Sequence, residues 1–175
     1  MSEPWTSLPG ALKEEISGCW PSVFPEGLPG WLAGDHVSEA DVAEAIARSL
    51  FLRQTLERHP EQIRPAVAAR PLTEPTTEAW LADRWRDYLQ NVDSEPALHA
   101  ALRQYRREVQ FRIIWRDLMK WADLHETMAA TSAFADTAID GALNWLYERA
   151  CEEFGTPMGD DPVTGQEAPQ KMVVL

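Results

Sequence analysis

The sequence has 175 residues and a mass of 19.8 kDa, a length that suits one domain and is too short for two well-filled cores. Hydrophobic residues make up 45% and charged residues 25%, which is the composition of a folded globular protein rather than a disordered chain. Sixteen Lys and Arg against 28 Asp and Glu give a formal net charge of -12. This charge argues against nucleic acid or an anionic membrane surface as a partner.

The cysteines and the apolar runs indicate a cytoplasmic protein. Cys19 and Cys151 lie far apart, and the sequence shows neither a disulfide framework nor the charged and apolar regions of a secretory signal. No apolar run approaches the roughly 20 residues that are needed to span a bilayer. We therefore expect free thiols in a reducing compartment and no membrane segment.

The first 37 residues are dense in residues that interrupt helices. They contain five prolines and five glycines, interspersed with Trp5, Trp20, Phe24 and Trp31. Prolines at this density exclude a long helix or a central strand. The sequence therefore predicts an irregular arm over 1–37 whose aromatic residues pack on the rest of the chain, with disorder only at its first few residues.

A helical domain is predicted over 38–157. Ser38 followed by Asp41 predicts a capping box, and the helix that starts there should end near His59 because the next residue is a proline. Prolines at 65, 71 and 75 then predict a broken connection.

Three more helices follow in this domain. Apolar spacing predicts one helix from about Thr77 to about residue 90, and Ser94 with Pro96 in the first turn predicts the start of a long central helix. A fourth is expected over 124–154, ended by Gly155, and its small residues would allow a close partner helix.

The last segment, 158–175, reads as a turn-rich linker followed by one strand over 171–175. A single strand cannot satisfy its backbone groups, so we expect it to begin a sheet with residues that this sequence does not contain. The predicted fold class is therefore mainly α: an irregular multi-helix bundle with a Pro/Gly-rich N-terminal arm and one short C-terminal strand.

Motifs for self-contained catalysis are absent from the sequence. It has no phosphate-binding glycine loop, nucleophile elbow, zinc-protease motif or pair of closely spaced cysteines. It also lacks the Glu-x-x-His pairs of di-iron bundles, and its four histidines show no spacing typical of a catalytic triad. No catalytic, cofactor-binding or metal-binding residue is predicted.

One segment is basic in this acidic chain. Its six cations are Arg103, Arg106, Arg107, Arg112, Arg116 and Lys120. Arg112, Arg116 and Lys120 are spaced to share one helix face. Two interpretations are open: the cations pair with acidic side chains of neighbouring helices, or they contact an acidic partner or a phosphate group. The three that share a face are the candidate contact residues.

Several segments together resemble the bacterial glutamine synthetase adenylyltransferase/adenylyl-removing enzyme family. These segments are 102–108, 111–118, 122–127, 134–136, 142–147, 154–157 and 172–175. The resemblance is most specific over 98–175 and weaker over 38–70, where residues 56–61 look like an early helical part of the adenylyl-removing half. It is not visible over 1–37.

The resemblance implies that the strand at 172–175 is followed in the family by a glycine-rich turn and a Ser-Asp-x-Asp motif, which hold ATP phosphates and magnesium. We expect this chain to be an N-terminal fragment of the adenylyl-removing half, truncated before that motif and inactive alone, with no cofactor of its own. The implied partners are glutamine synthetase, a PII signal protein and the remainder of its own chain. A stand-alone, non-catalytic helical module that binds another protein is the alternative.

Overall fold

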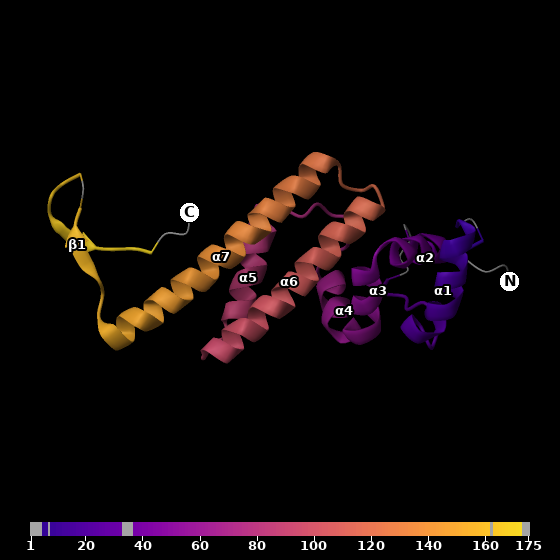
Figure 1. Ribbon diagram of the computed structural model, residues 1–175, viewed down its shortest axis with the longest axis horizontal. Coiled ribbons are helices and arrows are strands. Elements are labelled where there is room, and N and C mark those ends of the chain that lie inside the picture. The colour runs from indigo at the N-terminus through magenta and orange to yellow at the C-terminus, as the bar shows by residue number, and fades with distance from the viewer. Residues whose placement is uncertain (1–4, 7, 33–36, 162, 173–175) are drawn as a thin grey trace.

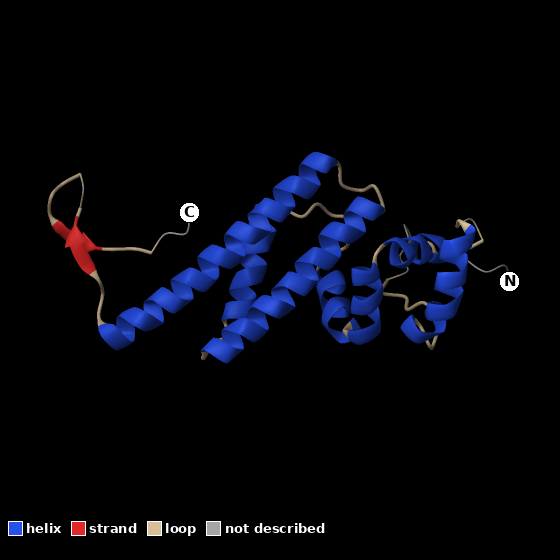
Figure 2. Cartoon of the chain, in the orientation of Figure 1, coloured by secondary structure: helices blue, strands red, loops and turns tan. Residues whose placement is uncertain are grey.

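The computed structural model describes residues 5–6, 8–32, 37–161 and 163–172. The described residues form seven helices and one two-stranded sheet, so the predicted mainly α fold class is confirmed (Figures 1 and 2). The elements are α1 Gly10–Val23, α2 Glu39–Arg48, α3 Leu50–Arg58, α4 Pro60–Ala69, α5 Glu78–Leu89, α6 Glu95–Leu118, α7 Leu124–Phe154, β1 Met158–Asp160 and β2 Glu167–Pro169. Figure 1 shows an elongated molecule with α1 and α2 at one end and the hairpin at the other.

The prediction of an irregular arm is wrong for residues 10–23, which form α1. The prolines stand at the two ends of this helix, because Pro9 occupies the N-cap and Pro21 lies in the last turn. Pro9 costs nothing because the first amides of a helix have no partner within it, and Pro21 removes a hydrogen bond from the last turn only, so most of the helix is intact. The expected disorder of the first few residues concerns 1–4, which lie outside the described residues.

The aromatic residues of this region do pack, as predicted. Trp20 lies 4.8 Å from Phe24 and 5.3 Å from Trp5, measured between ring centroids. Trp5 and Phe24 are buried in a core that α1 shares with α2, α3, α4 and the C-terminal half of α6. Burial of these large rings stabilises the attachment of α1 to the other helices.

The single helix predicted from Ser38 to His59 is divided into α2 and α3. The capping box at its start is confirmed, since the Ser38 hydroxyl accepts from the Asp41 amide at 3.2 Å. Ser49 breaks the helix with an extended backbone, and its side chain then accepts from the Leu52 amide at 3.3 Å to begin α3. The predicted broken connection over prolines 65, 71 and 75 is wrong at Pro65, which lies inside α4; this helix starts at Pro60, where proline is well tolerated in a first turn.

The next three predicted helices are confirmed. The Thr77 and Ser94 side chains cap α5 and α6, and α7 ends at Gly155, whose φ of 86° is in the left-handed region. The central position of α6 is also confirmed. Phe111 contributes to the first core, whereas Tyr105 joins a second core shared with α5 and α7.

A glycine sets the distance between α5 and α7. A Cβ atom on Gly141 would lie 1.7 Å from the indole nitrogen of Trp85, far inside van der Waals contact. Only a residue without a side chain fits there, which agrees with the expectation that small residues allow a close partner helix.

The C-terminal segment differs from its prediction. The linker contains an antiparallel hairpin in which Met158 pairs with Pro169 and Asp160 with Glu167, and this hairpin is not among the predicted elements. Lys171 and Met172 are exposed and lie outside any strand, while the rest of the predicted strand, 173–175, lies outside the described residues. The domain boundaries at 37 and 157 stay predictions.

Two further expectations concern the cysteines and the membrane. Cys19 and Cys151 are free thiols, as predicted. Among the described residues, no helix combines the length and the apolar character needed to cross a membrane.

Candidate functional site

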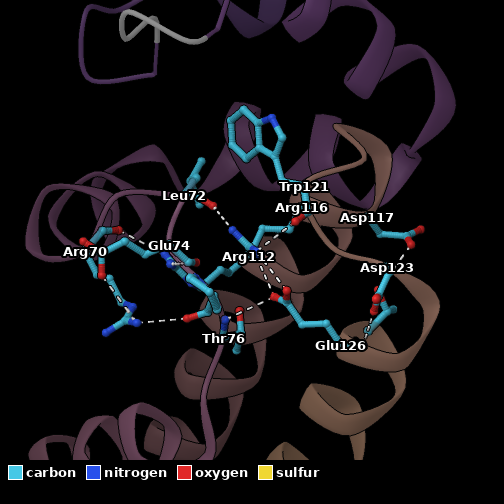
Figure 3. A network of polar contacts seen from close by, with 12 residues as sticks. Arg70, Leu72, Glu74, Thr76, Arg112, Arg116, Asp117, Trp121, Asp123 and Glu126 are labelled. Atoms are coloured by element: carbon cyan, nitrogen blue, oxygen red, sulfur yellow. Dashed lines mark hydrogen bonds and ion pairs between the residues drawn. The ribbon is translucent and has the colours of Figure 1, made fainter.

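Arg112 is buried against the connection between α4 and α5. Its side chain is 3% exposed, and its guanidinium donates to the carbonyl oxygens of Arg70 at 3.0 Å, Pro71 at 2.7 Å and Glu74 at 2.5 Å (Figure 3). The guanidinium carbon also lies 5.1 Å from the ring centroid of Trp80. Charged donors form strong hydrogen bonds, so Arg112 holds this connection onto α6.

Arg116, one turn further along α6, forms a two-pronged ion pair with Glu126 at the start of α7. The distances are 2.9 Å from Nε to Oε1 and 3.1 Å from the second prong to Oε2 (Figure 3). The same guanidinium donates to the carbonyl oxygens of Leu72 at 2.8 Å and Trp121 at 3.2 Å, and Glu126 also accepts from the Thr76 amide at 3.3 Å. One ion pair therefore joins α6, α7 and the segment before α5.

The local electrostatics follow from this arrangement. The hydrogen bond from Arg116 holds the pKa of Glu126 below its usual range, against the opposing effect of burial. Burial lowers the pKa of Arg112 to about 10, and the positive charges of Arg70 and Arg116 act in the same direction. Arg112 has no carboxylate within ion-pair distance among the described residues, so carbonyl dipoles and the Trp80 ring stabilise its charge.

A second ion pair, between the half-buried Arg84 and the buried Glu108, joins α5 to α6. Arg84 donates to both oxygens of Glu108, at 2.7 and 2.9 Å, and the Tyr88 hydroxyl donates to Glu108 Oε2 at 2.7 Å. Burial and the Glu108 charge raise the pKa of Tyr88, which keeps its hydroxyl protonated as a donor. Glu108 is 2% exposed, so this carboxylate is compensated within the molecule.

Two of the three predicted contact residues are therefore used inside the molecule. Arg112 and Arg116 give their donors to backbone carbonyls and to Glu126, and the geometry favours the interpretation in which the cations serve internal pairing. Lys120 does not share their face: α6 ends at Leu118, and Lys120 has a φ of 58° in the turn that follows. Lys120 is exposed, and its contact with a partner stays a prediction.

The acceptors of this network, Glu126 and the carbonyls of 70–74, are not among the residues predicted from the sequence. A signal was present in the spacing, because Arg112 follows the apolar Tyr105 by seven residues and Arg116 follows Val109 by seven. Two turns of a helix bring such residues to nearly the same face, and the Tyr105 and Val109 face is buried. Buried arginines require acceptors, but their position along the chain cannot be read from one helix.

Within the described ranges, no group of three or more His, Cys, Asp or Glu side chains could hold a metal ion. The donors of the buried Arg112 and Arg116 are taken up by internal acceptors.

Comparison with known proteins identifies the family. A family model described as glutamate-ammonia ligase adenylyltransferase matches residues 39–175, from α2 to beyond the hairpin. The chain belongs to this family. The match confirms the resemblance that the sequence motifs indicated.

Three similar relatives are each described as a bifunctional glutamine synthetase adenylyltransferase/adenylyl-removing enzyme. The one from Pseudomonas putida is 39% identical over 132 residues, which is 75% of this chain and 13% of that protein. Those from Pseudomonas syringae and Pseudomonas aeruginosa are each 37% identical, over 86% and 77% of this chain and 15% and 13% of their own lengths. The chain thus spans about one seventh of these adenylyltransferases, by the 13–15% that it covers.

Proposed function

We propose that this family member forms a helical framework of an enzyme that adds AMP to glutamine synthetase and removes it again, within the adenylyl-removing half. The family match over residues 39–175 carries this proposal. The matched residues include α6 and α7, the two longest helices of the described chain, and the networks of Arg112, Arg116 and Glu108.

The proposed role of the framework is positional. Arg116 and Glu126 fasten the beginning of α7 to α6, and Gly141 lets Trp85 of α5 approach α7 closely. Because Glu126 and Gly141 lie about 22 Å apart along α7, by its rise of about 1.5 Å per residue, the two contacts fix the direction of the long helix. A rigid helix of this kind can hold a catalytic unit at a constant position relative to its substrate.

The proposed cofactors and partners are those that the family resemblance implies. Magnesium and ATP would act at residues other than the described ones, and the whole enzyme would work in the cytoplasm under control of a PII signal protein. Glutamine synthetase, which the relatives' names contain, would be the protein that receives and loses AMP.

A chimeric enzyme tests the proposal. Residues 39–175 of this chain would replace the matching residues of the Pseudomonas putida enzyme, and AMP addition to and removal from purified glutamine synthetase would be measured. We expect both activities to be retained within a fewfold. A chimera that folds, as judged by circular dichroism and gel filtration, yet lacks both activities would contradict the proposal. A second chimera that also carries Gly141→Leu tests the positional role. It keeps the rest of the grafted sequence but disrupts the α5–α7 contact, so its activities should be lower than those of the first chimera.

A further inference from the structure

The structure divides the basic segment of α6 into two sets. Arg112 and Arg116 face the interior, whereas Arg103 and Arg106 are exposed and Arg107 is half-buried. Their spacing places the last three within roughly a 100° arc of the helix, on the side opposite the buried pair. The six cations of the sequence therefore do not form one surface.

Arg58 extends the outer set across the junction of α3 and α4. We call Arg58, Arg103, Arg106 and Arg107 the basic patch. Among the described residues, none of these four guanidinium groups lies within ion-pair distance of a carboxylate. The same is true of Arg64 and Arg112, whereas ion pairs are formed by Arg48, Arg53, Arg70, Arg84, Arg86, Arg116 and Arg149. Glu57, beside Arg58 in the sequence, instead accepts a hydrogen bond from Ser22 at 2.7 Å. Unpaired arginines are unexpected in a chain of charge -12, in which acidic partners are abundant.

Gln62 of α4 holds the centre of the patch in place. Its side-chain oxygen accepts a hydrogen bond from Arg107, and its nitrogen donates to the carbonyl oxygen of Gln104 at 2.7 Å. On the same helix, Arg106 Nε donates to Gln110 Oε1 at 3.2 Å. Neutral amide acceptors orient the guanidinium groups without cancelling their charge.

His59, between α3 and α4, is close to cations from two parts of the patch, Arg58 and Arg107. Desolvation lowers the pKa of His59, and the positive charges of Arg107 and Arg58 lower it further. A cation on α6 and a cation at the end of α3 therefore act on the same imidazole. Together with the hydrogen bonds from Gln62 to Arg107 and Gln104, this brings the end of α3 and the start of α4 beside the outer side of α6.

We propose that the basic patch is a docking surface for a carboxylate-rich surface of glutamine synthetase. This inference rests on the proposed function, which makes glutamine synthetase the protein partner. Arginine suits such a surface because its planar group forms two parallel hydrogen bonds with one carboxylate and is enriched at protein interfaces. Nucleic acid is the less favoured polyanion, since the net charge of -12 would repel its long continuous charge while a local acidic surface can approach the patch alone.

Direct binding to purified glutamine synthetase tests the inference. The 175-residue chain would be titrated onto immobilised glutamine synthetase by surface plasmon resonance, at low ionic strength and near 0.15 M, where the screening length is about 8 Å. The test variant is Arg103→Glu with Arg106→Glu. The control is Arg48→Glu with Arg86→Glu, which changes the charge equally at exposed arginines whose carboxylate partners are in the same helix.

We expect the patch variant to bind at least about tenfold more weakly, chiefly through a slower association, and the control to stay within about twofold of the parent chain. Equal losses in the two variants, no binding by the parent chain, or equally strong binding of duplex DNA would each overturn the inference. The chimera's activity reports on the proposed function separately. An active chimera combined with patch-independent binding would refute the docking surface alone, and a folded but inactive chimera would refute the proposed function.

Discussion

Replacing Arg116 by methionine should destabilise the protein strongly. The substitution keeps an unbranched side chain in the interior but removes the two prongs to Glu126 and the donors to the Leu72 and Trp121 carbonyls. Removing one partner of a buried ion pair typically costs about 3–5 kcal/mol, because the other charge is left without compensation. The Glu126 side chain retains 26% exposure and can be partly hydrated, so we expect a loss near the lower limit, about 3 kcal/mol.

Urea unfolding followed by far-ultraviolet circular dichroism measures this loss. For a chain of this size the same change would lower Tm by about 6–12 °C. Arg86→Met is the matched control, because Arg86 pairs with Asp83 in solvent, with side chains 70% and 69% exposed, and such pairs contribute at most about 1 kcal/mol. An Arg116→Met variant within about 1 kcal/mol of the parent would refute the argument that this ion pair fastens α6 to α7.

A second substitution separates the charge from the packing. In Arg116→Met combined with Glu126→Leu, no charge is left buried without a partner. Replacing both members of an ion pair with apolar residues is often neutral or better, so the double variant should be more stable than Arg116→Met alone. If the loss in the double variant equals the sum of the losses in Arg116→Met and Glu126→Leu measured alone, the uncompensated carboxylate is not the cause.

Three further predictions concern single positions. Gly141→Ala should lose about 1–3 kcal/mol of stability because its Cβ would meet Trp85. Gly18→Ala, in a helix with open space around it, should gain about 0.5–1 kcal/mol in the same urea assay, and equal effects would contradict the close contact. Lys120→Gly should gain about 1 kcal/mol by relieving the left-handed backbone, and a loss on urea unfolding would contradict this. The folded-state pKa of Glu126 lies below its usual 4.5, so its contribution is present above pH 4.5 and is lost as pH falls through the folded value. Acid titrations should therefore show a smaller loss of stability in Glu126→Gln than in the parent, and parallel curves would contradict the pairing.

The predictions that succeeded depend on short stretches of sequence. Ser38, Thr77 and Ser94 cap helices through contacts three residues away, so local chemistry is enough to locate these helix starts. Gly155 could be predicted as a helix end for the same reason, since left-handed backbone favours glycine.

The predictions that failed depend on position within an element or on distant contacts. Prolines were interpreted as breakers over 1–37, but Pro9 and Pro21 lie at the ends of α1, and their count does not reveal this placement. The hairpin has three residues in each strand and contains glycine and proline, so it carries no alternating apolar pattern.

At the candidate site, too, the sequence does not reveal which of the α6 cations are buried. The seven-residue spacing from Tyr105 to Arg112 places that arginine on a buried face, but a guanidinium is ordinarily assigned to solvent. The acceptors of Arg112 are the backbone carbonyls of Arg70, Pro71 and Glu74. Every residue type has such a carbonyl, so the sequence does not mark these positions as acceptors. Only the fold brings that connection to α6.

The rate at which the Pseudomonas putida chimera releases AMP from adenylylated glutamine synthetase tests the central claim most directly. That claim is that residues 39–175 serve as a framework of an adenylyl-removing enzyme, and the release reaction requires the framework to hold the catalytic unit against its protein substrate. The account predicts a release rate within a fewfold of the parent enzyme, and a further large loss when Arg116→Met is added to the graft. A folded chimera with background release, or one whose release is unaffected by both Arg116→Met and Gly141→Leu, would contradict it.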